Sequence, residues 1–344
     1  MFAPFQSTEP GFITLTKSLR ELTALKPNHS FHLDRKHPVP LPHHCQVYDF
    51  ISIQLTGIDY RELLHNPYLD FGVELKELSA VYIEFPKTAK WRNMKIEILG
   101  SDYITLKGSL HKYWKGGYNF DDFSFSEAIL AINDLCDKLK IKPKNCILRN
   151  LEIGVNLLLP FNPKKATDSL ICYKGKRFAP MNSTGRDSIG EKCSFQRYEI
   201  KIYNKRIMSG GQNILRVELK VVRMEHLKKA GFKTLADLTR KAKIKKSKKF
   251  LIDILDNTIF DDNSVDESKL NNWEKDIFLN GRNPRFWEEI IKKPSLCFKK
   301  KAQFRKIVKQ YGKEGIQPMI KGMFNNKWEE LLNENPHLES ASKV

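Results

Sequence analysis

Tyr203 stands between two lysines in a segment whose residue pattern predicts a β-strand. Apolar and polar residues alternate through residues 198–205, which places Tyr203, Lys201 and Lys205 together on the polar face. Residues two apart on a strand lie about 7 Å from each other on the same side, so both ammonium groups can reach a phosphate at the phenol. This arrangement suits a tyrosine that attacks a phosphodiester. An amphipathic edge strand with solvated lysines would show the same pattern.

Two acids and a histidine take outward positions on three other predicted strands. They are His111, Glu152 and Glu218, in strands predicted over residues 103–111, 148–159 and 214–222. In one antiparallel sheet all three could project from the face that carries Tyr203. Two carboxylates and an imidazole can hold Mg²⁺ or Mn²⁺, and such an ion would offset charge as the tyrosine oxygen attacks. For any one of these residues taken singly, a chance polar residue on a solvated face is the alternative interpretation.

The elements that must position these residues are strands in the first part of the chain and helices in the last. Alternating patterns predict further strands over residues 47–55, 81–85 and 94–99. A helix is predicted over 124–139, where Ser124 and Glu127 have the spacing of a capping box. Later helical patterns cover residues 248–255, 284–291, 300–311 and 327–332. This order predicts an α+β fold with a central antiparallel sheet, flanking helices and a helical, basic C-terminal region.

The charge balance indicates a polyanionic partner. Lys and Arg number 59 against 40 Asp and Glu, a formal net charge of +19, and nucleic acid is the first candidate. The candidate DNA-binding cations lie in a loop of aromatics and glycines, on the polar sheet face and in the basic run after residue 220. They are Lys112, Lys115, Lys201, Arg216, Lys220, Lys245, Lys246, Lys248 and Lys249.

Two further compositional features bear on where the protein works. No apolar run of about 18 residues is present, so no membrane-spanning helix and no membrane partner are expected. Six cysteines are scattered without a CxxC pair, which is typical of free thiols in a reducing cytoplasm.

Four short segments, in their order and approximate spacing, resemble the gene II replication initiators of filamentous phages. They are Gly-Ser-Leu-His at 108–111, Leu-Arg-Asn-Leu-Glu-Ile at 148–153, Ile-Tyr-Asn-Lys at 202–205 and Leu-Arg-Val-Glu-Leu at 215–219. The resemblance covers about residues 80–240, and rolling-circle initiators of plasmids share the tyrosine strand and the later Arg-x-Glu strand. Asn156 stands where these families often carry an acid, so Asn156 is not assigned as a metal ligand.

The resemblance implies a site-specific endonuclease and topoisomerase that starts rolling-circle replication of a phage or plasmid in a bacterial cytoplasm. Such an enzyme nicks one origin strand, leaves a 5′-phosphotyrosine and a free 3′-OH, and later rejoins the displaced strand. By motif position, Tyr203 would be the nucleophile and Lys205 its cationic neighbour. Glu152 and Glu218 would bind Mg²⁺ or Mn²⁺, with His111 as a third ligand or a DNA contact.

The implied partners are origin DNA, single-stranded or supercoiled, with the host's replication helicase and polymerase. The expected organisation is an N-terminal arm (residues 1–40), a nicking endonuclease domain (41–240) and a helical DNA-binding or accessory region (241–344). A non-catalytic sequence-specific DNA-binding protein and an RNA-binding protein are the two alternatives from other classes.

Overall fold

The computed structural model describes residues 47–73, 84–119, 123–181 and 189–333, all within the unit Pro42–Val344. The expected arm, residues 1–40, and residues 81–83 of a predicted strand lie outside this part of the chain.

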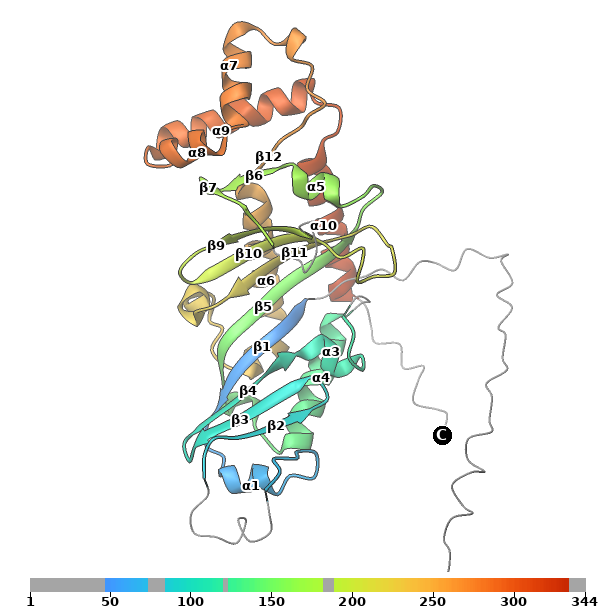
Figure 1. Ribbon diagram of the computed structural model, residues 1–344, viewed down its shortest axis with the longest axis vertical. Coiled ribbons are helices and arrows are strands. Elements are labelled where there is room, and N and C mark those ends of the chain that lie inside the picture. Colours follow the sequence, from blue (N-terminus) through green and yellow to red (C-terminus); the bar gives the residue numbers. More distant parts are fainter. Residues whose placement is uncertain (1–46, 74–83, 120–122, 182–188, 334–344) are drawn as a thin grey trace, which may run out of the picture. The chain divides into compact units, whose positions relative to one another are not determined.

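A large antiparallel sheet forms the centre of the described chain (Figure 1). Its strands run in the order β2-β3-β4-β1-β5-β11-β10-β9-β8. Their bounds are β2 Lys87–Trp91, β3 Met94–Gly100, β4 Tyr103–Ser109, β1 Tyr48–Leu55, β5 Cys146–Leu158, β11 Ile214–Val221, β10 Tyr198–Asn204, β9 Gly190–Ser194 and β8 Ala179–Pro180. The three strands that carry Glu152, Glu218 and Tyr203, namely β5, β11 and β10, are therefore consecutive neighbours in the middle of the sheet.

Three helices cover one face of this sheet, which leaves the polar residues on the other face. They are α4 (Phe125–Leu139), α6 (Lys241–Asn257) and α10 (Ile316–Asn333). Alternate residues of β5, such as Leu151 and Val155, pack into the same hydrophobic core as Phe324 and Trp328 of α10. The predicted capping box of Ser124 and Glu127 is present at the start of α4.

A second hydrophobic core joins three helices to a small sheet. The helices are α7 (Asn272–Gly281), α8 (Pro284–Ile290) and α9 (Pro294–Tyr311), and the sheet has the order β12-β6-β7 (Thr258–Phe260, Leu170–Tyr173, Lys176–Arg177). The remaining helices are short: α1 Tyr60–Leu64, α3 Leu110–Trp114, α5 Lys164–Asp168 and the 3₁₀ helices Pro143–Asn145, Met224–Ala230, Leu235–Thr239 and Glu267–Lys269.

The predicted α+β fold, with its antiparallel sheet, flanking helices and C-terminal helices, is confirmed. The main core continues past the expected boundary at residue 240, because α6 and α10 pack against the sheet. Ile171 and Cys172, from the middle of the chain, belong to the second core together with residues after 258. None of the helices in the described ranges is long and apolar enough to cross a membrane.

Candidate active site

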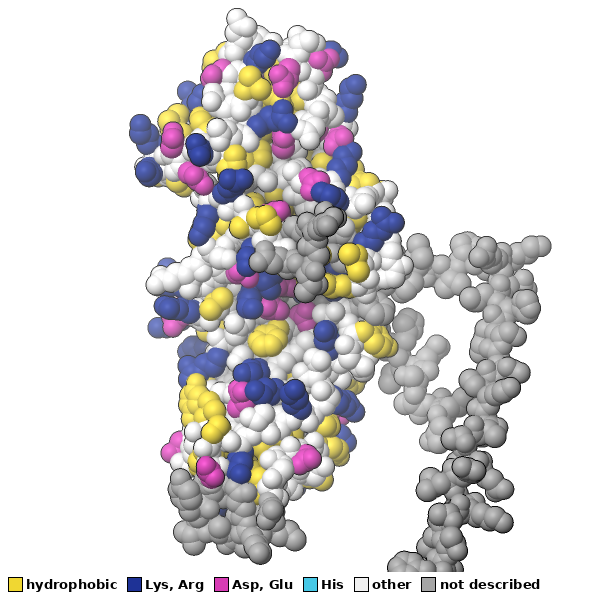
Figure 2. Space-filling view, in the orientation of Figure 1, with side chains coloured by type: hydrophobic (Ala, Val, Ile, Leu, Met, Phe, Trp, Pro, Cys, Tyr) yellow, Lys and Arg dark blue, Asp and Glu magenta, His cyan; other side chains and the backbone are white. Residues whose placement is uncertain are grey.

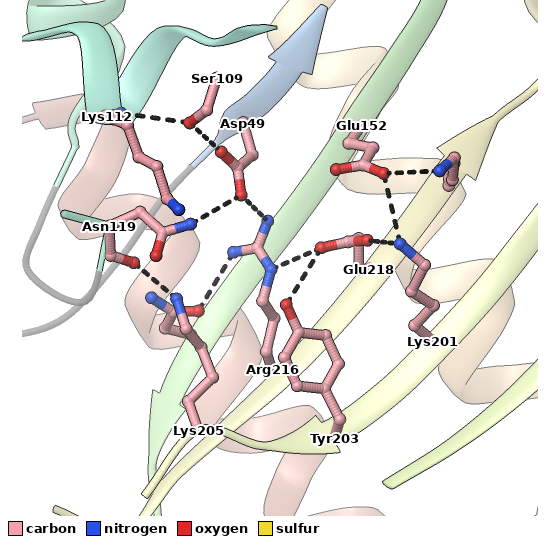
Figure 3. Close-up of polar contacts among 12 residues, drawn as sticks. Asp49, Ser109, Lys112, Asn119, Glu152, Lys201, Tyr203, Lys205, Arg216 and Glu218 are labelled. Carbon is pink, nitrogen blue, oxygen red and sulfur yellow. Dashed lines mark hydrogen bonds and ion pairs between the residues drawn. The ribbon is translucent and has the colours of Figure 1, made fainter. Parts of the chain in front are cut away.

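The register of three strands brings six polar side chains onto one sheet face. Lys201 of β10 lies opposite Glu218 of β11, and Tyr203 lies opposite Arg216. Lys220 of β11 lies opposite Glu152 of β5. Because residues two apart on a strand share a face, all six point to the side of the sheet opposite the helices. Figure 3 shows five of them, labelled, meeting in one polar cluster. The prediction that Tyr203, Glu152 and Glu218 share a face is thus confirmed.

A third carboxylate, Asp49 of β1, joins this cluster. Asp49, Glu152 and Glu218 are all buried, and each offers an oxygen that lies within 4.8 Å of the others. Strict alternation would put Asp49 on the apolar face with Ile51. The register between β1 and β5 shifts between Tyr48 and Ile51, however, and this bulge turns Asp49 to the polar face. An acid between the aromatic residues Tyr48 and Phe50 of a strand was the signal that could have identified it.

Asp49 is held in place by side chains from two other segments. Its carboxylate accepts hydrogen bonds from the hydroxyl of Ser109, at the end of β4, and from Nδ2 of Asn119 at 3.2 Å. These contacts fix the carboxylate beside Arg216, whose Nη2 lies 3.6 Å from Oδ2 of Asp49.

A half-buried lysine and a buried arginine lie among the three carboxylates. Nζ of Lys201 is 2.8 Å from Oε1 of Glu218 and 3.2 Å from Oε1 of Glu152. Nε of Arg216 is 2.7 Å from Oε2 of Glu218. Burial alone would raise the pKa of Glu218, but Arg216 and Lys201 outweigh it and lower that pKa to about 2. Burial and the charge of Glu218 instead raise the pKa of Glu152. Glu218 is therefore the firmly ionised member of the pair.

Arg216 was expected to contact DNA, and the structure contradicts this. Its side chain is fully buried, and its guanidinium joins Asp49 and Glu218 and donates to Oδ1 of Asn156 at 3.1 Å. Gly154 makes the room for it, since a Cβ there would lie 2.6 Å from Nη2 of Arg216. Arg216 is an internal counterion of Asp49 and Glu218. Asn156, its third partner, is neutral and stands at the position where an acid was considered from the sequence.

Tyr203 places its hydroxyl next to this charged cluster. The hydroxyl donates to Oε2 of Glu218 at 3.4 Å (Figure 3). Burial and then the Glu218 carboxylate raise the pKa of Tyr203 well above its ordinary value. The phenol is thus held neutral in the site as it stands. Any use of its oxygen as a nucleophile requires positive charge to enter beside it.

Lys205 does not reach a phosphate at the phenol in the way its spacing suggests. Its side chain is buried, and Nζ donates to the backbone carbonyl of Asn119 at 2.5 Å. Burial and then the charge of Arg216 lower the pKa of Lys205 to about 7. Lys205 anchors the segment that holds Asp49 and can change its charge near neutral pH.

His111 was predicted on an outward strand position, and this position is wrong. Strand β4 ends at Ser109, whose side chain accepts from the backbone N–H of Lys112 at 3.1 Å and caps helix α3. His111 is therefore on a helix, fully buried, and its ring stacks on Phe123 with centroids 4.9 Å apart. The metal-competent group among the described residues is Asp49, Glu152 and Glu218, without His111.

The other predicted DNA-binding lysines have varied surroundings. Lys112 is half-buried in α3, while Lys115 forms an ion pair with Glu127 at 2.6 Å. Lys220 lies 3.4 Å from Oε1 of Glu152, at the open side of the polar cluster. On α6, Lys248 pairs with Glu329 at 2.6 Å, and Lys246 donates to the carbonyl of Ala230 at 3.1 Å. The two others, Lys245 and Lys249, are exposed.

The donor set suits a hard divalent cation. Three carboxylates within 4.8 Å offer the oxygen ligands that Mg²⁺ and Mn²⁺ prefer, with water or a phosphate oxygen left to complete the shell. Lys201 and Arg216 share these carboxylates, so an ion would compete with Lys201, whose ammonium group lies between Glu152 and Glu218.

Comparisons with known proteins find similar solved structures but no sequence relative. No protein-family model matches the chain, and no curated protein matches it. The chain is similar in structure to the rolling circle replication initiator protein from Geobacillus stearothermophilus, with a TM-score of 0.35 and 14% identity. The match covers 71% of this chain and 94% of the other. A TM-score of 0.35 is too low for this likeness to bear on the fold or the activity of the protein described here.

Proposed function

We propose that the protein is a rolling-circle replication initiator that nicks one DNA strand through Tyr203. One observation carries this proposal: the Tyr203 hydroxyl lies 3.4 Å from a carboxylate oxygen of Glu218, which is itself one of three clustered carboxylates. A nucleophile beside a site suited to a divalent cation is the combination that phosphoryl transfer by a tyrosine needs. The segment resemblance to gene II initiators points to the same chemistry.

In the proposed reaction, the Tyr203 oxygen attacks the scissile phosphorus and the bond from phosphorus to the 3′ oxygen breaks. The products are a 5′-phosphotyrosine ester and a 3′-hydroxyl that has taken up a proton. Glu218, which stays ionised, orients the phenol through its hydrogen bond; the phenol proton passes to solvent, and the 3′ oxygen takes up its proton from water. Attack of a 3′-hydroxyl on the phosphotyrosine reverses the step and rejoins a strand. A divalent ion held by Asp49, Glu152 and Glu218 would supply the positive charge that makes the phenolate accessible and offsets charge on the phosphate.

The chain's other residues orient this chemistry. Arg216 holds Glu218 and Asp49 in fixed positions through buried ion pairs. Lys220 lies at the open side of the cluster, where its side chain is 34% exposed and can meet a phosphate. The 3′-hydroxyl would prime the host polymerase behind a replicative helicase, and the protein would act in the cytoplasm of the bacterial host.

The test is a search for a covalent DNA adduct. Single-stranded oligonucleotides tiling both strands of the replicon that encodes the protein are incubated with it and Mg²⁺ or Mn²⁺. We expect an adduct that survives denaturing electrophoresis with the wild type and disappears in Tyr203→Phe. Tyr198→Phe is the matched control, because Tyr198 is on the same strand but faces the helix side, stacked on Phe195 and His226.

Two outcomes would overturn the proposal. An adduct formed by Tyr203→Phe would remove the nucleophile, and tight DNA binding without any adduct would indicate a non-catalytic DNA-binding protein. Preferential binding of RNA in competition with single-stranded DNA would indicate the RNA-binding alternative.

A further inference from the structure

Helix α9 presents an exposed stripe along its whole length. Phe304 and Ile307 are buried in the second core, while Cys297, Val308 and Tyr311 pack against it. The opposite side of α9 is exposed and continues from turn to turn. Its residues are Ser295, Phe298, Lys299, Ala302, Lys306, Lys309 and Gln310, and Leu296 is exposed beside them. From Ser295 to Lys309 this stripe is about 21 Å long, at 1.5 Å per residue.

The stripe is strongly basic and has no acid near it in sequence. Residues 291–313 contain nine Lys or Arg and no Asp or Glu. Within the described part of the chain, the side chains of Lys299, Lys306 and Lys309 have neither a hydrogen bond nor an ion pair. Figure 2 shows Lys and Arg side chains over the surface that α8 and α9 form, interspersed with Asp, Glu and hydrophobic side chains. Three free ammonium groups on one rigid face are available for an anionic partner.

Three of the six lysines of α6, a helix that is as basic in sequence, are engaged by other groups. Lys243 donates to the carbonyls of Ala230 and Gly231, Lys246 donates to Ala230, and Lys248 pairs with Glu329. These contacts engage Lys243, Lys246 and Lys248, whereas Lys241, Lys245 and Lys249 of the same helix are exposed.

We propose that the outer stripe of α9 docks into a groove of duplex DNA, on a surface separate from the candidate active site. The major groove admits an α-helix, and the stripe offers both cations for the phosphates and small or polar side chains for the base edges. Lys299, Lys306 and Lys309 would contact phosphates on either side. Ser295 and Gln310 can hydrogen-bond to base edges, and Ala302 allows close approach at the centre. Phe298, 77% exposed, would contact a thymine methyl or the sugars.

An anionic membrane is the other polyanion that a basic helix can meet. Membrane-surface helices carry a wide apolar face, whereas Ser295, Ala302 and Gln310 occupy the equivalent positions of this stripe. Duplex DNA therefore fits the stripe better. The inference depends on DNA being the substrate of the proposed function, but it concerns a different part of the molecule.

The experiment measures the salt dependence of binding to a 30-base-pair duplex by fluorescence anisotropy. Each phosphate contact adds about −0.9 to the slope of log K against log salt, so Lys299→Gln/Lys306→Gln/Lys309→Gln should flatten it by up to about 2.7. The matched control is Lys90→Gln/Lys142→Gln/Lys144→Gln, which neutralises three exposed lysines outside α9 and outside the predicted DNA-binding set and should leave the slope unchanged. A second pair of variants leaves every lysine in place. Ala302→Glu should weaken duplex binding at least tenfold, whereas Ala242→Glu, at an exposed position of α6, should not.

A wild-type slope in the α9 triple variant together with wild-type affinity in Ala302→Glu overturns the inference. The inference is also overturned if the α9 triple variant loses binding to phosphatidylserine vesicles while its duplex slope equals that of the wild type. The adduct assay on single-stranded oligonucleotides is run on the same variants. If α9 only docks the duplex, the adduct persists in both α9 variants. If no protein forms an adduct, wild type included, the nicking proposal is refuted, and the slope test of α9 still stands.

Discussion

Nζ of Lys201 lies 2.8 Å from Oε1 of Glu218, so the chain's own cation neutralises the carboxylate that contacts the Tyr203 hydroxyl. The same ammonium group is 3.2 Å from Glu152, and it therefore lies between two of the three candidate metal ligands. A divalent ion and Lys201 must compete for these oxygens. Release of Lys201 toward a substrate phosphate would couple DNA binding to ion binding.

Lys201→Met should lower the free energy of unfolding in metal-free buffer, because it leaves Glu152 and Glu218 with fewer counterions. It should also tighten Mn²⁺ binding at least about tenfold, since a competing positive charge is removed. Titration calorimetry measures the affinity, and Lys192→Met is the control on the neighbouring strand, directly opposite Lys201. Equal Mn²⁺ affinity in wild type and Lys201→Met would show that the ion does not use these carboxylates.

Glu218→Gln and Glu152→Gln should differ in stability even though both remove a candidate ligand. Glu218 is ionised and paired with buried Arg216 and half-buried Lys201, so its amide leaves Arg216 with Asp49 as its one carboxylate partner among the described residues and should cost about 3–5 kcal/mol. Burial and the charge of Glu218 raise the pKa of Glu152, so the fold disfavours its ionised form and Glu152→Gln should cost little. Urea unfolding compares them. Equal losses would mean that the two carboxylates share the buried charge evenly.

Gly154→Ala should disturb the site without touching a polar group. The added Cβ would lie 2.6 Å from Nη2 and 2.8 Å from Cζ of Arg216, in a fully buried position. We expect a loss of about 1–3 kcal/mol from overpacking, together with displacement of Arg216 from Glu218. Gly100→Ala is the control, because a Cβ there meets nothing within 4 Å. Similar melting temperatures for the two variants would contradict the close packing of Arg216 on Gly154.

Lys205 should make stability rise with pH. Its pKa is lowered to about 7 in the folded protein from an ordinary value of 10.5, so between these values the unfolded chain holds a proton that the folded chain has released. Stability then increases with pH in this window, by up to about 1.4 kcal/mol per pH unit relative to Lys205→Met. Urea unfolding of both proteins from pH 6.5 to 10 measures the difference. Parallel curves would show that Lys205 titrates normally.

The sequence by itself determined which face of its strand each central residue takes. Alternation with period two is a local property of the backbone, so it correctly put Tyr203, Glu152 and Glu218 on polar faces. The capping box at Ser124 is equally local and was equally predictable. The fold class followed from the order of these patterns along the chain.

Only the tertiary structure decided how these residues are combined. Asp49 reaches the cluster because a bulge against β5 shifts its register, and a bulge depends on the partner strand. His111 leaves the sheet because Ser109 caps a helix and Phe123 stacks on the imidazole. Arg216 is buried because Asp49, Asn156 and Glu218, from three strands, surround its guanidinium. Residue periodicity encodes the direction of a side chain, whereas burial and pairing depend on contacts between segments distant in sequence.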